Sequence, residues 1–305
     1  MEMIPNNLVQ NGDFSAGFTD WTLAGLTQNA QIVTEGDNQF ARFGPGVSMY
    51  QDVNVNAHDD YVFAFRFRAP YVGNGLDIKI EGLDANNNPS PPLVEQTFPQ
   101  TQNWTRKGTI FNTGQFTKLR ITFIIFSAAD VDDVGLFATG QPNQNGLFGS
   151  YYNGTDFNTL VFQRVDPQID FFWPTGSPPA LGNQKLNVND YSIRWLGYAL
   201  MPFVPINQPN RRIIFRTISD DGVRLWVYPL NTPQPGPIIN NWTLHSATAN
   251  DSLPQDLVPG DFYNIQLDLF NGPGTSTIQL MYYFEGDDPQ TAKTVPTEVL
   301  FPKTP

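Results

Sequence analysis

Apolar and polar residues alternate with a period of two in short stretches along most of this chain. In one such stretch, Tyr61, Phe63, Phe65 and Phe67 are separated by smaller or charged residues. A β-strand points successive side chains to opposite faces, so this alternation predicts strands that bury one face. No pattern for a long amphipathic helix accompanies these stretches. The alternation therefore predicts an all-β protein.

The composition agrees with many short strands joined by turns. The chain has 305 residues, among them 26 Pro and 25 Gly, and only 15% of its residues are charged. This length is sufficient for two domains, each with its own core. Residues 138–146 carry Gly, Pro and Asn without a large apolar side chain, which is typical of a linker. We predict two antiparallel, jelly-roll-like β-sandwich domains in tandem, at 1–140 and 147–305, joined by a linker at 141–146.

Charge and residue usage exclude several classes of function. A net charge of −12 disfavours nucleic acid and anionic membrane surfaces as partners, because both attract basic faces. No run approaches the roughly 20 apolar residues of a membrane span, so we expect no membrane insertion. The chain has no cysteine and two histidines, which excludes disulfides, thiol catalysis and histidine-rich metal clusters. Cations and neutral partners such as glycans remain.

The first residues, MEMIPNNLVQNG, lack the basic and apolar regions of a secretory signal peptide. We therefore expect a chain that begins at a mature terminus or is exported by another route.

Several motifs of the first half occur together in a recognisable order. They are residues 7–14 followed by Trp21, then residues 47–69, 103–114 and 130–137. In this order they resemble the jelly-roll carbohydrate-binding modules that accompany many glycoside hydrolases, over about residues 6–138. The resemblance implies a structural calcium ion held by acidic residues of the first and last strands.

The positions that match this implied calcium site are Asp13 and Asp132, with Asp133 as a further candidate. Carboxylates are suitable ligands for Ca²⁺, which takes six to eight oxygens. The alternative is that these aspartates only solvate the ends of strands. For sugar stacking, the aromatic candidates are Trp21, Trp104, Tyr50 and Tyr71. Core packing is the favoured interpretation for both tryptophans.

The second half carries a longer series of motifs, which covers nearly all of it in order. They are residues 146–157, 191–200, 219–227, 240–242, 257–272, 278–284 and 295–302. This series resembles the domain named after anthrax protective antigen, which occurs in bacterial toxins, glycosidases and fungal adhesins. The resemblance implies a second β-sandwich with a lectin-like function.

In the lectin-like members of that family, two adjacent aspartates joined by a cis peptide hold calcium together with an asparagine from a later loop. The matching residues are Asp220, Asp221 and Asn271, and carbonyl groups near Pro273 and Thr275 would complete the calcium shell. Two neighbouring carboxylates repel each other unless a cation lies between them, and the resemblance implies that such a cation also binds vicinal sugar hydroxyls. Asp220 and Asp221 are thus both metal ligands and glycan-binding candidates.

Each of these motifs also has a simpler interpretation as a turn. Asp221-Gly222 and Asn271-Gly272 are favoured hairpin turns, and Asp220 could cap such a turn. The second half also departs from fungal adhesins, which are stapled by disulfides. Its proline-rich segment after Val227 is longer than the usual hairpin. The glycan-facing loops are therefore not carried over from the family, and Tyr228 and Trp242 are named as candidate stacking rings.

These observations predict a non-catalytic, calcium-dependent glycan-binding protein that acts as an adhesin or targeting subunit. The alternatives are a structural protein that assembles into a surface layer, filament, spore-associated body or crystal, and an accessory subunit of a toxin or glycosidase. We expect no enzyme, because the paired carboxylates lie in polar turns and no catalytic motif is present. The expected location is extracellular or on the surface of a cell or spore. The expected partner is a glycan or polysaccharide.

Overall fold

The structure is a computed structural model that describes residues 7–139, 145–201, 211–230 and 232–303, with residues 71–74 described by their backbone only. In these ranges the regular structure consists of antiparallel strands and three short 3-10 helices. This confirms the prediction of an all-β fold. No helix in the described ranges has the length and the apolar character to span a bilayer.

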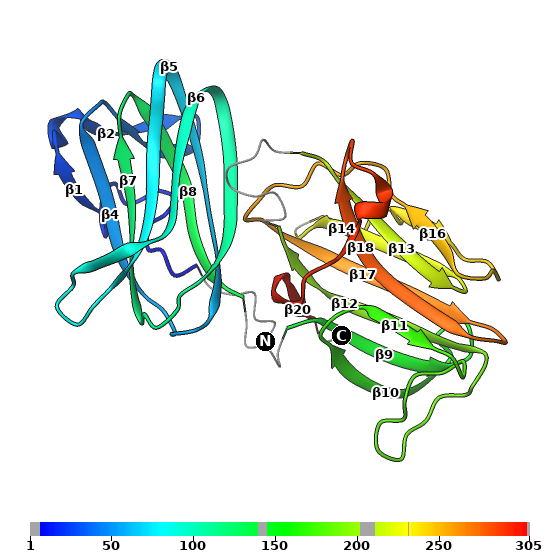
Figure 1. Cartoon of the computed structure of the whole chain (residues 1–305). Helices are drawn as coiled ribbons and strands as arrows, with labels where there is room; N and C mark the ends of the chain where they lie inside the picture. The colour runs from blue at the N-terminus through cyan, green and yellow to red at the C-terminus, as the bar shows by residue number, and fades with distance from the viewer. Residues whose placement is uncertain (1–6, 140–144, 202–210, 231, 304–305) are drawn as a thin grey trace.

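The first module, residues 7–139, is one hydrogen-bonded sheet folded into two layers (Figure 1). Its elements are β1 (Thr22–Gly25), η1 (Thr27–Asn29), β2 (Ala30–Glu35), β3 (Asn38–Phe43), β4 (Val47–Asn54), β5 (Asp60–Leu83), β6 (Pro89–Asn112), β7 (Lys118–Ile125) and β8 (Ala129–Ala138).

Strands β5 and β6 are 24 residues long and take part in both layers. Residues 61–68 of β5 pair with β8, whereas residues 76–82 pair with β7. Strand β6 accompanies β5 through both layers. One layer therefore has the order β2-β3-β8-β5-β6, and the other has the order β1-β4-β7-β5-β6.

The second module, residues 145–303, is a sandwich of two separate sheets. Its elements are β9 (Leu147–Asn153), β10 (Thr159–Asp166), β11 (Asp170–Trp173), β12 (Tyr191–Leu200), β13 (Ile213–Asp220), β14 (Val223–Pro229), β15 (Ile239–Asn241), β16 (Thr248–Asp251), β17 (Phe262–Asn271), β18 (Ser276–Phe284), η2 (Pro289–Thr291), β19 (Lys293–Thr294), η3 (Thr297–Val299) and β20 (Leu300–Pro302). The larger sheet has the order β10-β9-β12-β17-β14-β15, with β20 also paired to β12. The smaller sheet has the order β11-β18-β13-β16, with β19 paired to β18.

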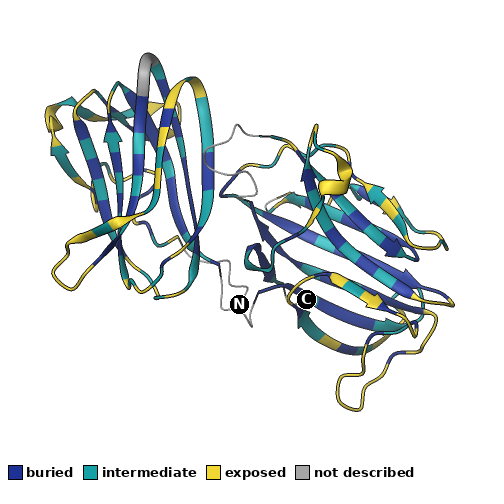
Figure 2. Ribbon diagram, in the orientation of Figure 1, coloured by how far each residue is buried: buried dark blue, intermediate teal, exposed yellow. Residues whose placement is uncertain are grey.

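Each module buries its own core between its layers (Figure 2). The period-two alternation is visible in β13, where every second residue is buried, and in β4 and β7 of the first module. Phe63, Phe65 and Phe123 are fully buried in the first core, and Trp195 and Phe215 in the second. Burial of such side chains stabilises a fold by about 1.5–3 kcal/mol each.

The predicted linker falls mostly outside the described residues, because residues 140–144 are not described. Its described part, Asn145 and Gly146, is buried and bonded to the second module: the Asn145 side chain donates to the Thr297 carbonyl, and the Gly146 N–H donates to the Leu300 carbonyl. The boundaries between the domains stay a prediction.

The two modules share a small apolar junction. The outward face of β5 in the first module meets β12 and β20 of the second, through the buried side chains Val62, Tyr198, Leu200 and Phe301. Beside them, the rings of Phe137 and Phe262 meet edge to face at 5.7 Å. Burial of apolar side chains from both modules favours one relative placement of the two sandwiches.

At the edge of this junction, Gly260 of the second module packs directly on Ala64 of the first. The Arg106 guanidinium also lies 3.3 Å from the Asp261 carboxylate, so one ion pair joins the modules here. A Cβ atom built on Gly260 would lie 2.4 Å from the Cβ of Ala64, and the φ of Gly260 is +82°. Only glycine fits this contact.

We therefore expect Gly260→Ala to loosen the junction and to cost about 1–3 kcal/mol through overpacking. Thermal unfolding would report this loss of stability, and small-angle scattering would report a larger radius of gyration. Gly182→Ala is the matched control, because its φ of +59° is also in the left-handed region and nothing lies within 4 Å of its added methyl group. Equal behaviour of the two variants would contradict the close contact.

Candidate functional site

The Asp220–Asp221 pair lies where the chain crosses from one sheet of the second module to the other. Strand β13 pairs with β16 and β18 in the smaller sheet, and β14 pairs with β15 and β17 in the larger one. Residues 272–275, which join β17 to β18, also cross from one sheet to the other. The prediction that these two segments are hairpin turns is therefore wrong. We call residues 220–222 and 272–275 the crossing turns.

The two crossing turns are hydrogen-bonded to each other through the aspartates. The Asp221 carboxylate is buried and accepts the N–H of Gly272 at 2.8 Å. The Asp220 carboxylate accepts the Thr275 hydroxyl at 3.2 Å, and the Asp220 carbonyl accepts the Ser276 hydroxyl at 3.0 Å. The peptide bond between the two aspartates is cis. The structure thus brings together Asp220, Asp221 and Thr275, as the resemblance implied.

Asn271 lies at the end of β17 and is completely buried. Its amide nitrogen donates to the carbonyl of Gly272 at 2.6 Å. Its amide oxygen has no hydrogen-bond donor among the described residues. A buried polar atom without a partner costs about 1–3 kcal/mol, so an oxygen in this position is suited to a cation. Pro273, the other predicted ligand, is exposed in the same crossing turn.

In the loop that follows β15, Trp242 was predicted to belong to this site, and His245 was not. The backbone N–H of His245 donates to the Asp221 carboxylate at 2.9 Å. The neighbouring Leu244 is 69% exposed, and its side chain lies close to Gly272. The residue type at position 245 could not predict this contact, because His245 makes it with its backbone N–H.

Negative charge accumulates at the crossing turns. Burial raises the pKa of Asp220, and the adjacent Asp221 charge raises it further, against the opposing hydrogen bond from Thr275. Burial also holds the pKa of Tyr191 well above its ordinary value, with a smaller contribution from both carboxylates. A divalent cation would relieve this repulsion.

The residues present at the crossing turns fit calcium. Two carboxylates and a free amide oxygen are hard ligands, which Ca²⁺ prefers, and backbone carbonyls can add to them. In the described ranges, no group of three or more His, Asp or Glu side chains is arranged to hold a metal. A site here therefore depends on amide and backbone oxygens as well as on the two carboxylates. Calcium binding stays a prediction.

The two candidate stacking rings lie in different places. Trp242 follows β15 close to the crossing turns, half-buried against Phe270 at 4.8 Å between ring centroids. The Arg224 guanidinium covers it at 3.8 Å. Tyr228 stands seven residues from Asp221 along β14, about 23 Å away at the rise of a strand. The assignment of Tyr228 to the same glycan site is therefore wrong.

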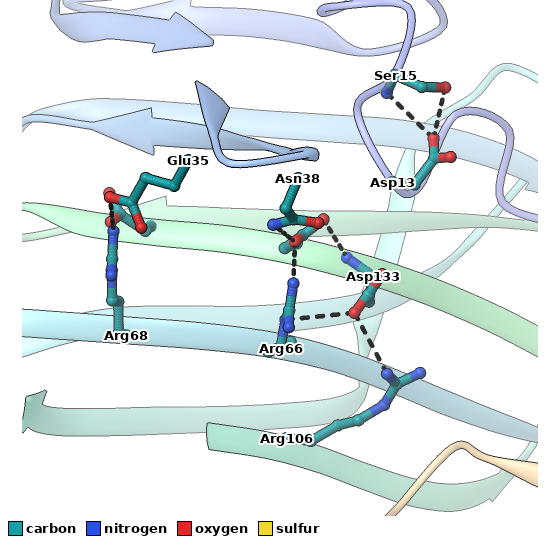
Figure 3. A network of polar contacts seen from close by, with 10 residues as sticks. Asp13, Ser15, Glu35, Asn38, Arg66, Arg68, Arg106 and Asp133 are labelled. Atoms are coloured by element: carbon teal, nitrogen blue, oxygen red, sulfur yellow. Dashed lines mark hydrogen bonds and ion pairs between the residues drawn. The ribbon is translucent and has the colours of Figure 1, made fainter. Parts of the chain in front are cut away.

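The predicted calcium site of the first module is corrected by the structure. Asp132 is fully buried, and its carboxylate accepts hydrogen bonds from Arg66, from Asn38 and from the N–H of Asp133 (Figure 3). Asp13 is exposed and accepts hydrogen bonds from Ser15. Asp132 therefore already has a cationic partner on a neighbouring strand, and the structure does not support it as a calcium ligand with Asp13.

Core packing is confirmed for Trp21, which is buried and donates its ring N–H to the Asn11 carbonyl. Trp104 is half-exposed, with the guanidinium groups of Arg66 and Arg68 each at 4.7 Å from its ring. Tyr50 is half-buried beneath the Arg120 guanidinium at 4.3 Å, and the side chain of Tyr71 lies outside the described residues.

A groove on the first module was not predicted. It has a volume of about 510 Å³ and is lined by Asn29, Gln31, Arg42, Phe43, Gly44, Pro45, Arg68, Pro70, Gln102, Ala128, Ala129 and Asp130. We call it the first-module groove. Its polar residues are amides, arginines and one carboxylate, which can donate to and accept from hydroxyl groups.

A row of three charged residues forms one wall of the first-module groove. Asp130 on β8 is buried between Arg42 on β3 and Arg68 on β5, and both arginines bond its carboxylate at 2.6–2.9 Å. Arg68 also reaches Glu35 at 2.7 Å (Figure 3). The two arginines and the two carboxylates give this network no net charge. The alternation of Arg66 and Arg68 with apolar residues was a signal for a charged sheet face, but the sequence did not show which carboxylates lie opposite.

No family model matches the chain. Anti-sigma-I factor RsgI3 of Acetivibrio thermocellus is 31% identical to it over 158 residues, which are 52% of this chain and 21% of that protein. The chain thus spans about a fifth of the length of this curated relative. Among solved structures, an anti-sigma factor domain-containing protein from Clostridium clariflavum covers 90% of this chain with 92% of its own, at 17% identity and a TM-score of 0.43.

Other solved structures that match are sugar-binding β-sandwiches. TmCBM61, solved with β-1,4-galactotriose, covers 44% of this chain with 99% of its own, at 17% identity and a TM-score of 0.34. The Epa6A adhesin domain of Candida glabrata covers 54% of this chain with 89% of its own, at 12% identity and a TM-score of 0.39. All these TM-scores are below 0.5.

The match to an anti-sigma-I factor contradicts the predicted function. An anti-sigma factor is a regulatory protein, and a calcium-dependent adhesin or targeting subunit is not.

Proposed function

We propose that this chain is the ligand-sensing region of an anti-sigma factor and that its ligand is a neutral polysaccharide. The observation that carries the proposal is the 31% identity to an anti-sigma-I factor over 158 residues. Two β-sandwiches, one with a groove of about 510 Å³, suit the recognition of a ligand. We place both modules outside the cell, because a polysaccharide is too large and too polar to cross a membrane. The proposal includes no catalytic step.

The residues of the first-module groove support a sugar ligand. Arg42, Arg68 and Asp130 are held in fixed positions by their mutual ion pairs, so their remaining hydrogen-bonding capacity is presented without a further loss of side-chain freedom. Gln31 and Gln102 add exposed amides on opposite sides of this row. The chain carries a net charge of −12 and the groove network is balanced, which favours a neutral polymer over an anionic one.

We also propose a calcium ion at the crossing turns. Asp220, Asp221 and the amide oxygen of Asn271 would hold it, together with carbonyl groups near Pro273 and Thr275. Calcium supplies positive charge that offsets the repulsion between the two carboxylates. The protein's own residues already join the crossing turns by hydrogen bonds, so the ion would strengthen a connection between the two sheets.

Affinity electrophoresis with soluble xyloglucan, galactomannan and mixed-linkage β-glucan tests the proposed function. We expect at least one polymer to retard the wild type, and Gln31→Ala combined with Gln102→Ala to weaken that binding at least tenfold, or about 1.4 kcal/mol. Gln96→Ala is the control, because Gln96 lies on β6 like Gln102 but does not line the groove. An absence of retardation by every polymer would contradict the proposal.

A further inference from the structure

The outward face of the larger sheet in the second module carries a continuous polar row. Its members lie directly opposite one another on neighbouring strands, in the order Gln163 on β10, Ser150 on β9, Arg194 on β12, Asp268 on β17, Arg224 on β14 and Asn240 on β15. Strands are spaced about 4.8 Å apart, so a row across six strands is about 24 Å long. We call it the polar row.

The centre of the polar row is built around a buried carboxylate. Asp268 is 0% exposed and accepts two hydrogen bonds from Arg194, both at 2.8 Å. It also accepts one from Arg224 at 3.3 Å and one from Gln266 at 3.1 Å. The carboxylate oxygens are therefore fully used within the protein, and they hold both guanidinium groups in place.

The two arginines, by contrast, face outward. The side chain of Arg194 is 35% exposed and that of Arg224 is 28% exposed. A guanidinium group has five N–H donors in a planar fork, so the two groups together have ten. The bonds to Asp268 use three of them. Fixed donors that are not used by the protein suit the hydroxyl oxygens of a sugar.

Aromatic rings border the polar row on both sides. On one side, Phe157 lies under the Arg194 guanidinium at 4.2 Å, and Trp242 lies under that of Arg224 at 3.8 Å. On the other side, Trp226 stands half-exposed on β14, opposite Gln266 of β17. A polar row with aromatic borders matches the two kinds of surface of a sugar ring, which has hydroxyl groups at its rim and apolar faces.

The first-module groove has the same arrangement at its wall. There Asp130 is buried on a central strand, Arg42 and Arg68 flank it on the neighbouring strands, and Phe40 lies beneath both guanidinium groups at 5.3 and 5.1 Å. The two modules differ in strand order, and each presents a buried aspartate between two arginines on an outward sheet face.

We propose that the polar row is a second binding site for the neutral polysaccharide, which would lie across the strands of the larger sheet. This inference rests on the proposed function and extends it to the outward face of the larger sheet, beside the candidate rings Tyr228 and Trp242. Two sites on one chain raise the affinity for a polymer well above that for a short oligosaccharide, because the second contact is intramolecular. The acidic balance of the chain again favours a neutral polymer.

The test uses the full chain and the same three neutral polymers, with two variants of the polar row. Arg224→Ala removes outward donors and leaves the bidentate pair of Asp268 with Arg194 intact, and Trp226→Ala removes a border ring. We expect each to weaken polymer binding at least tenfold, with unchanged thermal unfolding of the first module. Trp226→Phe keeps a ring and is expected to bind within threefold of the wild type.

Arg216→Ala is the matched control. Arg216 also forms a bidentate pair with an aspartate and covers a tyrosine, but it lies in the smaller sheet. If the Gln31/Gln102 variant loses binding while Arg224→Ala and Trp226→Ala bind like the wild type, this inference is overturned and the proposed function stands. If the wild type binds no neutral polymer, both are overturned. Alginate is included as a fourth, anionic polymer. If alginate alone binds, and its binding weakens steeply as salt is added, the neutral ligand is overturned.

Discussion

Asp220→Asn is expected to abolish calcium binding by the second module. The change removes one of the two negative charges at the crossing turns, while the new amide oxygen can still accept the Thr275 hydroxyl. In a calorimetric titration, we expect one calcium site in the wild type and none in the variant. Calcium at 100 times its dissociation constant should stabilise the wild type by about 2.7 kcal/mol, and this gain should vanish in the variant and after chelation.

Asp13→Asn is the control for this experiment. Asp13 was also predicted to bind calcium, but it lies in the first module, is exposed and is bonded to Ser15. We expect its removal to leave the calcium stoichiometry unchanged. Equal stoichiometry in the wild type and in Asp220→Asn would refute the site at the crossing turns.

Asp268→Ala is expected to be the most destabilising single change among the charged residues considered. It removes a completely buried carboxylate that accepts four hydrogen bonds and neutralises two arginines. Breaking a buried ion pair costs about 3–5 kcal/mol, and we expect a loss of about 3 kcal/mol because the arginines left behind are partly solvated. Guanidinium denaturation followed by tryptophan fluorescence would measure this loss.

Asp251→Ala provides the comparison, because it breaks a bidentate pair of the same kind in an exposed position. The Asp251 side chain is 33% exposed and pairs with Arg216 at 2.7 Å. Exposed ion pairs contribute about 0–1 kcal/mol, so we expect a shift of at most about 1 kcal/mol. If both substitutions shift the unfolding midpoint equally, burial is not the reason for the stability of the Asp268 pair.

The crossing turns illustrate how far the sequence alone could go at the candidate site. Asp220, Asp221 and Asn271 were predicted to meet, and the structure brings their segments together. Their turns were predicted to be hairpins because Asp-Gly and Asn-Gly favour tight turns. In the structure each turn changes sheets, since the strands on either side belong to opposite layers of one core. Turn chemistry shows that the chain reverses, and it does not show which layer the chain enters.

Asp132 illustrates a failure of the same kind. Its place in the last strand of the first module matched a family position for a calcium ligand. Its partner, Arg66, is 66 residues away on β5 and lies opposite it only through the pairing of β5 with β8. Because Arg66 supplies a positive charge to Asp132, the carboxylate has a partner without a metal ion. No pattern in the sequence around Asp132 reveals this partner.

The sequence by itself determined the strands, because a period of two places alternate side chains on a core face whatever the tertiary arrangement. It also determined that neither disulfides nor a histidine cluster could hold the protein together. Only the tertiary structure decided which strands are neighbours and in which register. Rows such as Arg42, Asp130 and Arg68, or Arg194, Asp268 and Arg224, exist through that register alone, because each member comes from a different strand.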